Sequence, residues 1–291
     1  MADVDPSFQL FADITAKAQH GVLVSMLRNY PVSRLIDCSV RNDRRAKSAA
    51  HINPLLRHGE KYFSQNDEDG ILLEILRRLD LQQGTFAEFG VGDGLENNTL
   101  ILLMSGWNGG WAGGQELAFA IPPTTTNLSY NKVWITRENT WKIYQDLAVR
   151  HGVIDVDLFS IDLDGNDLYI IEELMQCGAR PSIIVAEYNG KFPPPIAFTI
   201  DYDPGHRWNG SDWSGASLQS FVNLLNSYDY ALVACNITGL NAFFVKRSLL
   251  GDAFRDVPTA VSDLFLPADY ASIVGLGHPT SPRTISTFLK T

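Results

Sequence analysis

The sequence contains few cysteines and no long apolar segment, and both absences restrict the class of protein. Its 291 residues include only Cys38, Cys177 and Cys235, which lie far apart and not at zinc-binding spacing. We therefore expect no disulfide framework, no structural zinc and a reducing compartment. No run of 18 or more apolar residues occurs, so we expect no membrane-spanning helix and no membrane partner.

Basic residues are scarce relative to acidic ones. The chain has 23 Lys and Arg against 33 Asp and Glu, which gives a net charge of −10. Nucleic acid requires a cationic surface, so this balance argues against a nucleic-acid partner and for a small or neutral substrate. The N-terminus, MADVDPSFQL, lacks the basic start and apolar stretch of a signal peptide, and we expect a cytoplasmic protein.

From residue 61 onward, strand patterns alternate with helix patterns. Strands are predicted at 84–90, 109–117, 132–136, 156–162 and 181–188, with helices at 64–80, 96–106, 138–152, 167–178 and 215–229. Such alternation predicts right-handed crossovers and a parallel sheet covered on both faces. Two last strands, 230–236 and 241–247, are separated only by ITGL and must form an antiparallel hairpin. The predicted fold is α/β, a Rossmann-like doubly wound seven-stranded sheet with a terminal antiparallel hairpin.

The chain is expected to have three parts. Residues 1–60 contain FADITAKAQHGVLVSMLRN, whose apolar spacing is helical, and predict an N-terminal arm or cap. A homo-oligomer contact, if one forms, is expected through this arm. Residues 61–250 are the α/β domain, and residues 251–291 are an extension packed on it.

In doubly wound sheets, ligands bind outside the carboxyl ends of the strands. The predicted ligand edge therefore comprises residues 90–94, 115–116, 136–139, 162–167 and 187–189.

The segment EFGVGDG places Gly90, Gly92 and Gly94 between a predicted strand and a predicted helix. One glycine suffices for such a turn, and three at this spacing favour a ligand that approaches the backbone. The spacing differs from the dinucleotide pattern G-x-G-x-x-G. With Glu88 ahead of it, the segment resembles the first motif of class I S-adenosylmethionine-dependent methyltransferases.

The resemblance extends over residues 61–247. The ordered segments YFSQNDEDGILLEIL, FAEFGVGDGLENNT, SGWNGGW, FSIDLDGNDLYI, VAEYNGKFPP, SDWSGASL and GLNAFF are similar to the FkbM-type methyltransferase family. This resemblance implies a class I methyltransferase fold, S-adenosylmethionine as methyl donor and a hydroxyl acceptor, often on a sugar or natural product. Glu88, the three glycines and Asn139 are the predicted cofactor contacts.

One position departs from the family pattern. After GW the family has two apolar residues and an acid that holds the cofactor ribose, whereas this chain reads WAGGQEL, with Gly113 near the acid position. Glu116 lies about 22 residues beyond Gly94, close to the separation of about 20 usual in βαβ units. Glu116 is therefore the predicted ribose ligand, with Gln115 as a weaker substitute.

The segment SIDLDGND looks at first like a calcium loop. Asp162, Asp164, Asn166 and Glu173 match positions 1, 3, 5 and 12, but Asp167 stands where the loop requires glycine. A strand precedes the segment and a helix follows at once, which excludes an EF-hand.

A catalytic metal site is a stronger interpretation than a calcium loop, although a metal-free polar site is favoured over both. Asp162 ends one predicted strand, and Glu187 and Asn189 end the next, so they would form an oxygen cluster suited to Mg²⁺ or Mn²⁺. Such an ion would lower the pKa of an acceptor hydroxyl. The alternative is a metal-free polar site, in which Asp167 caps the next helix and Asp162 takes the hydroxyl proton directly.

A long loop rich in proline and aromatic residues, 190–214, follows these strands and is predicted to form a lid or a substrate wall. His206 is a candidate general base, while Lys191 and Arg207 are candidate contacts for an anionic group. Asp162, Asp164 and His206 are the predicted acceptor-activating residues.

The sequence thus predicts an S-adenosylmethionine-dependent O-methyltransferase acting on a hydroxyl of a small molecule, with or without a divalent metal. Two alternatives stay open. The first is an enzyme of the same fold with other, metal-dependent chemistry, hydrolysis or rearrangement, that has lost normal cofactor use. The second is a non-enzymatic scaffold.

Overall fold

A computed structural model describes residues 42–269 and 280–291 of the chain. The chain divides into two compact units, residues 1–46 and residues 47–291, rather than at residue 60. Most of the predicted N-terminal arm, and with it the expected oligomer contact, lies outside the described residues. The description below concerns the second unit.

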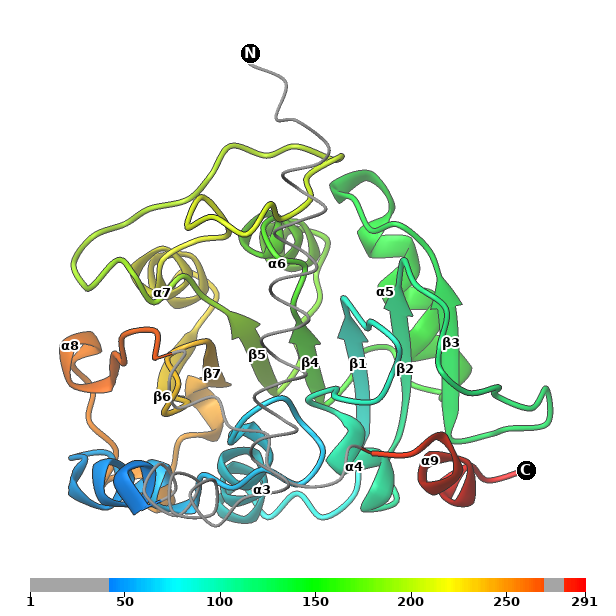
Figure 1. The fold of residues 1–291 in the computed structure, drawn as a ribbon, viewed down its shortest axis with the longest axis horizontal. Coiled ribbons are helices and arrows are strands. Elements are labelled where there is room, and N and C mark those ends of the chain that lie inside the picture. The colour runs from blue at the N-terminus through cyan, green and yellow to red at the C-terminus, as the bar shows by residue number, and fades with distance from the viewer. Residues whose placement is uncertain (1–41, 270–279) are drawn as a thin grey trace, which may run out of the picture. The chain divides into compact units, whose positions relative to one another are not determined.

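The second unit is built on a seven-stranded sheet of order β3-β2-β1-β4-β5-β7-β6, shown in Figure 1. The strands are β1 (Thr85–Phe89), β2 (Asn108–Gly113), β3 (Leu128–Lys132), β4 (Leu158–Ile161), β5 (Ile183–Glu187), β6 (Tyr230–Cys235) and β7 (Asn241–Lys246). The first five are mutually parallel, and β7 runs antiparallel to both β5 and β6. The predicted α/β class and the terminal hairpin are confirmed, and the sheet is compatible with a Rossmann-like fold.

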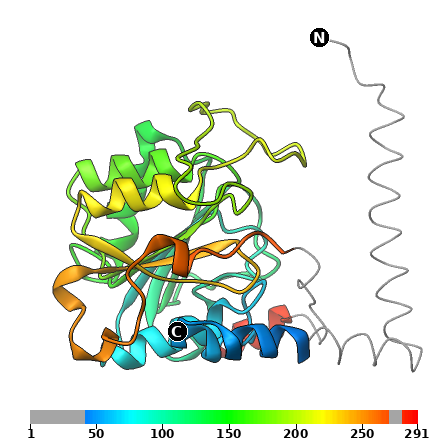
Figure 2. The same ribbon diagram turned by 90° about the vertical axis from the view of Figure 1, so that its left-hand side faces the viewer.

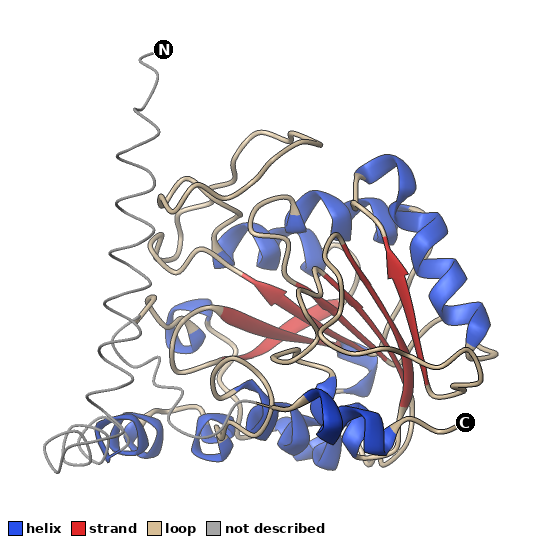
Figure 3. Cartoon of the chain, turned by 45° about the vertical axis from the view of Figure 1, so that its right-hand side comes forward, coloured by secondary structure: helices blue, strands red, loops and turns tan. Residues whose placement is uncertain are grey.

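Helices cover both faces of the sheet (Figures 2 and 3). One face carries α5 (Arg137–Arg150), α6 (Asp167–Gln176), α7 (Leu218–Asn226) and α8 (Val261–Leu264), and the other carries η1 (Pro54–His58), α3 (Glu68–Arg78), α4 (Leu100–Met104) and α9 (Pro282–Phe288). Two short 3₁₀ turns, η2 (Arg247–Leu249) and η3 (Asp252–Phe254), follow β7. Among the described residues, no helix has both the length and the apolar content needed to cross a bilayer.

Alternation along the strands decides which polar residues reach which face. Leu158, Val185 and Phe243 belong to the apolar cluster under α3 and α4. Because strand side chains alternate, residues an even number of positions away point to the same face. Glu187 and Asn241 therefore lie on the α3 side, at the edge where the parallel strands end.

Two predicted elements are corrected. The strand expected at 132–136 is β3 at Leu128–Lys132, because that segment pairs in register with β2. The helix expected at 96–106 is only α4, Leu100–Met104. The residues just before α4 donate backbone N–H groups to the carboxylate of Glu88 and stay outside the helix.

Candidate functional site

Three carboxylates meet where β4 and β5 end. One oxygen each from Asp162, Asp164 and Glu187 lies within 4.8 Å of the others. Asp162 and Glu187 are half-buried, whereas Asp164 is exposed. The β4–β5 register pairs Ile161 with Ala186, so Asp162 and Glu187 are neighbours across the sheet. The structure therefore brings together two of the three predicted metal ligands and adds Asp164 to them.

The turn after β4 is held by Asp167. Its carboxylate accepts the backbone N–H groups of Leu163, at 2.8 Å, and Gly165, at 3.1 Å. Asn166, not Asp167, occupies the N-cap position of α6. Asp164 has φ +58°, a left-handed conformation that is uncommon for residues other than glycine. Asp167 thus fixes the turn in the shape that presents Asp164 to the cluster.

Burial and mutual repulsion raise the pKa values of these acids. Desolvation, followed by the charges of Asp162, Asp167 and Asp164, raises the pKa of Glu187 well above its usual range. Desolvation and the charge of Asp164 also raise the pKa of Asp162. Two carboxylates this close titrate as a pair rather than independently.

In the described part of the chain, no lysine or arginine balances this charge. Among residues 42–269 and 280–291, no lysine or arginine forms an ion pair with Asp162, Asp164 or Glu187. His206 is the residue whose charge lowers the pKa of Asp164, against the desolvation that raises it. A cluster of carboxylates without a paired base is suited to a divalent cation.

Asn189 does not join the cluster. Its Nδ2 donates to the carbonyl oxygens of Asp212, at 2.9 Å, and Ser214, at 3.0 Å, and its Oδ1 accepts the N–H of Lys191 at 3.1 Å. Both Nδ2 protons and one acceptor position of Oδ1 serve the 190–214 loop. The prediction of Asn189 as a metal ligand is therefore not supported by its position, since the side chain anchors the loop.

The same loop brings His206 to the site. The imidazole lies over Gly165, where an added Cβ would stand 2.3 Å from His206 Cδ2. His206 Nε2 is buried and has no hydrogen-bond partner among the described residues. Asn166 Nδ2 donates to the carbonyl of Asp203 at 2.8 Å and ties the loop to the acidic turn. The loop thus forms a wall of the site, and His206 stands beside Asp164.

Glu88 is buried and bonded to its own chain. Its carboxylate accepts the N–H groups of Asn98 and Thr99, at 2.9 and 3.0 Å, and the Thr99 hydroxyl at 2.5 Å. Desolvation raises the pKa of Glu88 to about 7, although these hydrogen bonds oppose the shift. The carboxylate therefore joins β1 to the start of α4.

The glycine turn and the end of β2 are closely packed at three glycines. An added Cβ would lie 1.6 Å from the Asp162 carbonyl oxygen at Gly90, and 2.1 Å from the Val91 carbonyl oxygen at Gly113. At Gly94 it would lie 3.0 Å from side-chain carbons of Leu117 and Phe119. The end of β2 therefore has no room for the acid that the family pattern places there.

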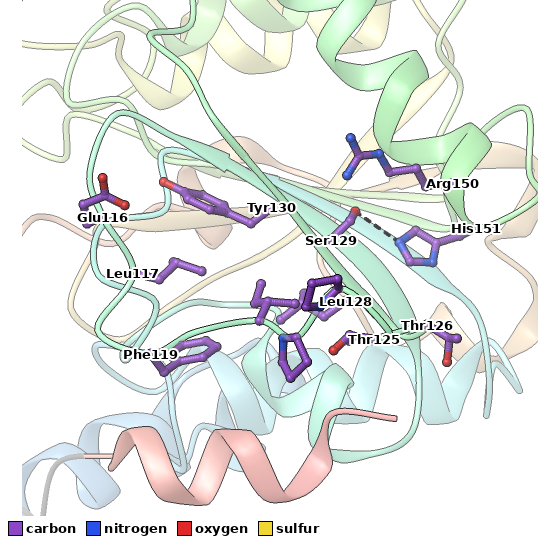
Figure 4. A pocket seen from close by; sticks show the side chains of 13 residues that line it. Glu116, Leu117, Phe119, Thr125, Thr126, Leu128, Ser129, Tyr130, Arg150 and His151 are labelled. Atoms are coloured by element: carbon purple, nitrogen blue, oxygen red, sulfur yellow. Dashed lines mark hydrogen bonds between the residues drawn. The ribbon is translucent and has the colours of Figure 1, made fainter. Parts of the chain in front are cut away.

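Only the middle of the turn is open. At Gly92 an added Cβ would meet nothing nearer than Gln115 Nε2, at 3.8 Å, and Gln115 itself is exposed. Glu116 points elsewhere: its side chain is 79% exposed and pairs with Lys132. It lines a hollow of about 660 Å³ beside β3, together with Tyr130 and residues of the 117–126 loop (Figure 4). Gln115, rather than Glu116, adjoins the glycine turn.

Asn139 belongs to the start of α5. Its Oδ1 accepts the N–H of Thr136 at 2.8 Å, and its Nδ2 donates to the Trp134 carbonyl at 2.9 Å. This reciprocal arrangement with Thr136 is a capping box, which explains the residue without a cofactor.

Two residues of the site have no signal in the sequence. Glu68, in the first turn of α3, and Asn241, at the start of β7, are buried and joined by a hydrogen bond of 3.0 Å. Only the β5–β7 register, which sets Asn241 opposite Glu187, reveals that they adjoin the cluster.

The residues present fit a divalent metal better than they fit S-adenosylmethionine. The clustered carboxylate oxygens, which pair with no lysine or arginine of the described residues, suit Mg²⁺ or Mn²⁺. For the cofactor, Gly92 and Gln115 leave a place of approach, but the carboxylate expected at the ribose is missing.

Comparisons with known protein families, with curated proteins and with solved structures find no match for this chain.

Gly90 and Gly92 should respond differently to replacement by alanine. Gly90→Ala should lower the free energy of unfolding by at least about 3 kcal/mol, because φ is +88° and the new Cβ would strike the Asp162 carbonyl. Gly92→Ala, at an open position, should change it by no more than about 1 kcal/mol. Urea unfolding measures both, and equal losses in the two variants would contradict this account of the turn.

Buried acids should make the metal-free protein more stable as the pH falls from about 8 to about 5. Burial raises the pKa of Asp69 to about 6 and of Glu88 and Asp167 to about 7. In this window the native state binds protons that the unfolded chain does not, and each adds up to about 1.4 kcal/mol per pH unit. Urea unfolding with a chelator at several pH values tests this, and Glu88→Gln should flatten the slope. Stability that rises with pH over this range would refute it.

Proposed function

We propose that this chain is an S-adenosylmethionine-dependent O-methyltransferase that activates the hydroxyl of a small acceptor at the acidic cluster. The observation that carries the proposal is the convergence of Asp162, Asp164 and Glu187 at the carboxyl edge of the sheet. This is the edge at which doubly wound sheets bind ligands. The FkbM-type resemblance supplies the reaction class, and the acceptor is expected to be a sugar or a natural product.

The chemistry of the acceptor follows from the residues of the cluster. A hydroxyl must lose its proton as it attacks a methyl group, so a base within hydrogen-bonding reach accelerates the step. Asp162 and Glu187 lie side by side at the cluster, and a carboxylate of either would accept that proton. The buried Nε2 of His206, beside Asp164, would be a second acceptor in the neutral form of the imidazole. A divalent cation held by the cluster would lower the pKa of the hydroxyl.

The aromatic residues of the 190–214 loop, which forms a wall of the site, are suited to binding a small acceptor. Phe192 and Phe198 stack with ring centroids 4.0 Å apart, and Trp213 packs edge-on against Phe198. Trp208 and Trp213 nevertheless stay more than half exposed. Exposed aromatic rings on a loop beside the cluster suit a sugar or a planar acceptor, because such rings stack on apolar faces.

Replacing the central acid should separate chemistry from cofactor binding. Asp162→Asn should lower the rate of methyl transfer at least about a hundredfold, because the cluster loses the carboxylate that is assigned to accept the hydroxyl proton. The affinity for S-adenosylmethionine should stay within a few-fold, since Asp162 is assigned to the acceptor. Turnover assays and calorimetry measure the two quantities. A selective loss of cofactor affinity would move Asp162 to the cofactor site.

A second function is favoured by one observation, the close contact of Gly113 with the Val91 carbonyl. This contact leaves no room for a side chain at the position where a ribose-binding acid is usual. The second function is therefore that of a metal-dependent enzyme of other chemistry, hydrolysis or rearrangement. The carboxylate cluster would serve water or a substrate oxygen in the same way.

Binding of S-adenosylhomocysteine distinguishes the two functions. For a methyltransferase, calorimetry should show binding that Gln115→Ala weakens several-fold, because Gln115 adjoins the open Gly92. Glu116→Ala should leave the affinity unchanged, since that side chain pairs with Lys132 in solvent. A thermal shift with Mn²⁺ but none with the cofactor product would favour the second function.

A further inference from the structure

Asp162, Glu187 and Asn241 form a row across three neighbouring strands. The β4–β5 register sets Asp162 beside Glu187, and the β5–β7 register sets Glu187 directly opposite Asn241. Side chains directly opposite in an antiparallel pair lie on one face, with Cβ atoms about 5 Å apart. Asn241 therefore extends the acidic cluster by one strand, on the face that carries α3.

Asn241 has a buried acceptor with nothing to accept from. Asn241 is only 4% exposed, and its Oδ1 has no hydrogen-bond partner among the described residues. Its Nδ2 donates to Glu68 Oε1 at 3.0 Å. A carboxylate only accepts hydrogen bonds, so the amide nitrogen must face Glu68 and the oxygen must turn away from it.

Glu68 is itself fixed in position. It is fully buried, and its carboxylate accepts hydrogen bonds from Asn236 Nδ2 at 2.7 Å and from the N–H of Asn66 at 2.8 Å. Asn236 Oδ1 in turn accepts the backbone N–H of Asn241 at 2.8 Å. The network joins the start of α3 to the start of β7 and holds the Asn241 amide in one orientation.

We propose that Asp162, Asp164, Glu187 and Asn241 together bind one hard divalent cation, Mg²⁺ or Mn²⁺, and that Glu68 positions the Asn241 carbonyl as a ligand. This cation site is the acceptor-activating half of the proposed function and rests on it. The donor set is three carboxylates and one amide oxygen, which are hard ligands. Asn241 takes the place that the sequence assigned to Asn189.

A cation explains more than a buried water would. A water could donate to Asn241 Oδ1, but it would leave the charge of the three carboxylates uncompensated. A divalent cation satisfies the unpartnered oxygen and offsets two of the three negative charges at once, and charges removed from water are costly without such a partner. The network also gives the acidic segment SQNDED a role at the site, through Glu68.

Calorimetric titration of the full-length protein with MnCl₂ tests the site. The wild type should bind one Mn²⁺. Asn241→Ala should weaken binding about tenfold or more, and Glu68→Gln by roughly 10- to 100-fold, as for residues that orient a ligand. Asn127→Ala is the matched control, because among the described residues this buried amide bonds only the backbone of Phe288 and Lys290, away from the cluster; its Mn²⁺ affinity should equal that of the wild type.

Direct ligation is tested with Asn241→Cys and Cd²⁺. A thiolate at this position should shift the preference from Mn²⁺ to Cd²⁺ and give a thiolate-to-cadmium charge-transfer band, with wild-type Cys residues as the baseline. A merely structural Asn241 would produce no such band.

Three outcomes overturn the proposal. They are wild-type protein that binds no Mn²⁺, unchanged Mn²⁺ affinity in both Asn241→Ala and Glu68→Gln, and no cadmium band in a folded Asn241→Cys protein. If one variant fails to fold, the other still decides. Absence of cofactor binding with intact Mn²⁺ binding would contradict the methyltransferase function and leave the cation site standing.

Discussion

The site depends on how the negative charge of several carboxylates is compensated at one edge of the sheet. Carboxylates from α3, β1, β5 and the turn after β4 gather there, and the described residues bring no lysine or arginine to the central three. Buried like charges are unfavourable unless protons, backbone donors or cations compensate them. The fold supplies backbone donors to several of these acids, and it leaves the central three in an arrangement suited to a cation.

The acids divide by what their oxygens accept. Asp69 receives three backbone N–H groups from residues 62–64, Asp167 receives two from its own turn, and Glu88 receives those before α4. These carboxylates shape loops and helix starts. Asp162, Asp164 and Glu187 instead face one another. The site therefore consists of the acids that are not used to shape loops and helix starts.

The sequence predicts the sheet well because alternation and strand spacing are local signals. It also predicts the carboxyl ends of β1, β4 and β5 to within a residue, and hence the places of Asp162 and Glu187. It fails where tertiary contacts decide: the start of β3 is set by pairing with β2, and Asn189 is drawn into the following loop. Glu116 has the right separation from the glycines, yet the chain after Gly113 carries it into solvent. Asn241 could not be found, because its place depends on the register of a strand more than 50 residues from Glu187 in the chain.

The measurement that tests the central claim most directly is a crystal structure of the full-length protein grown with Mn²⁺, with anomalous scattering recorded from the metal. The account predicts one anomalous peak about 2.0–2.2 Å from oxygens of Asp162, Asp164 and Glu187 and from Asn241 Oδ1, with the Asn241 amide nitrogen on Glu68. It would be contradicted by a cluster without metal whose carboxylates pair with a lysine or arginine from elsewhere in the protein.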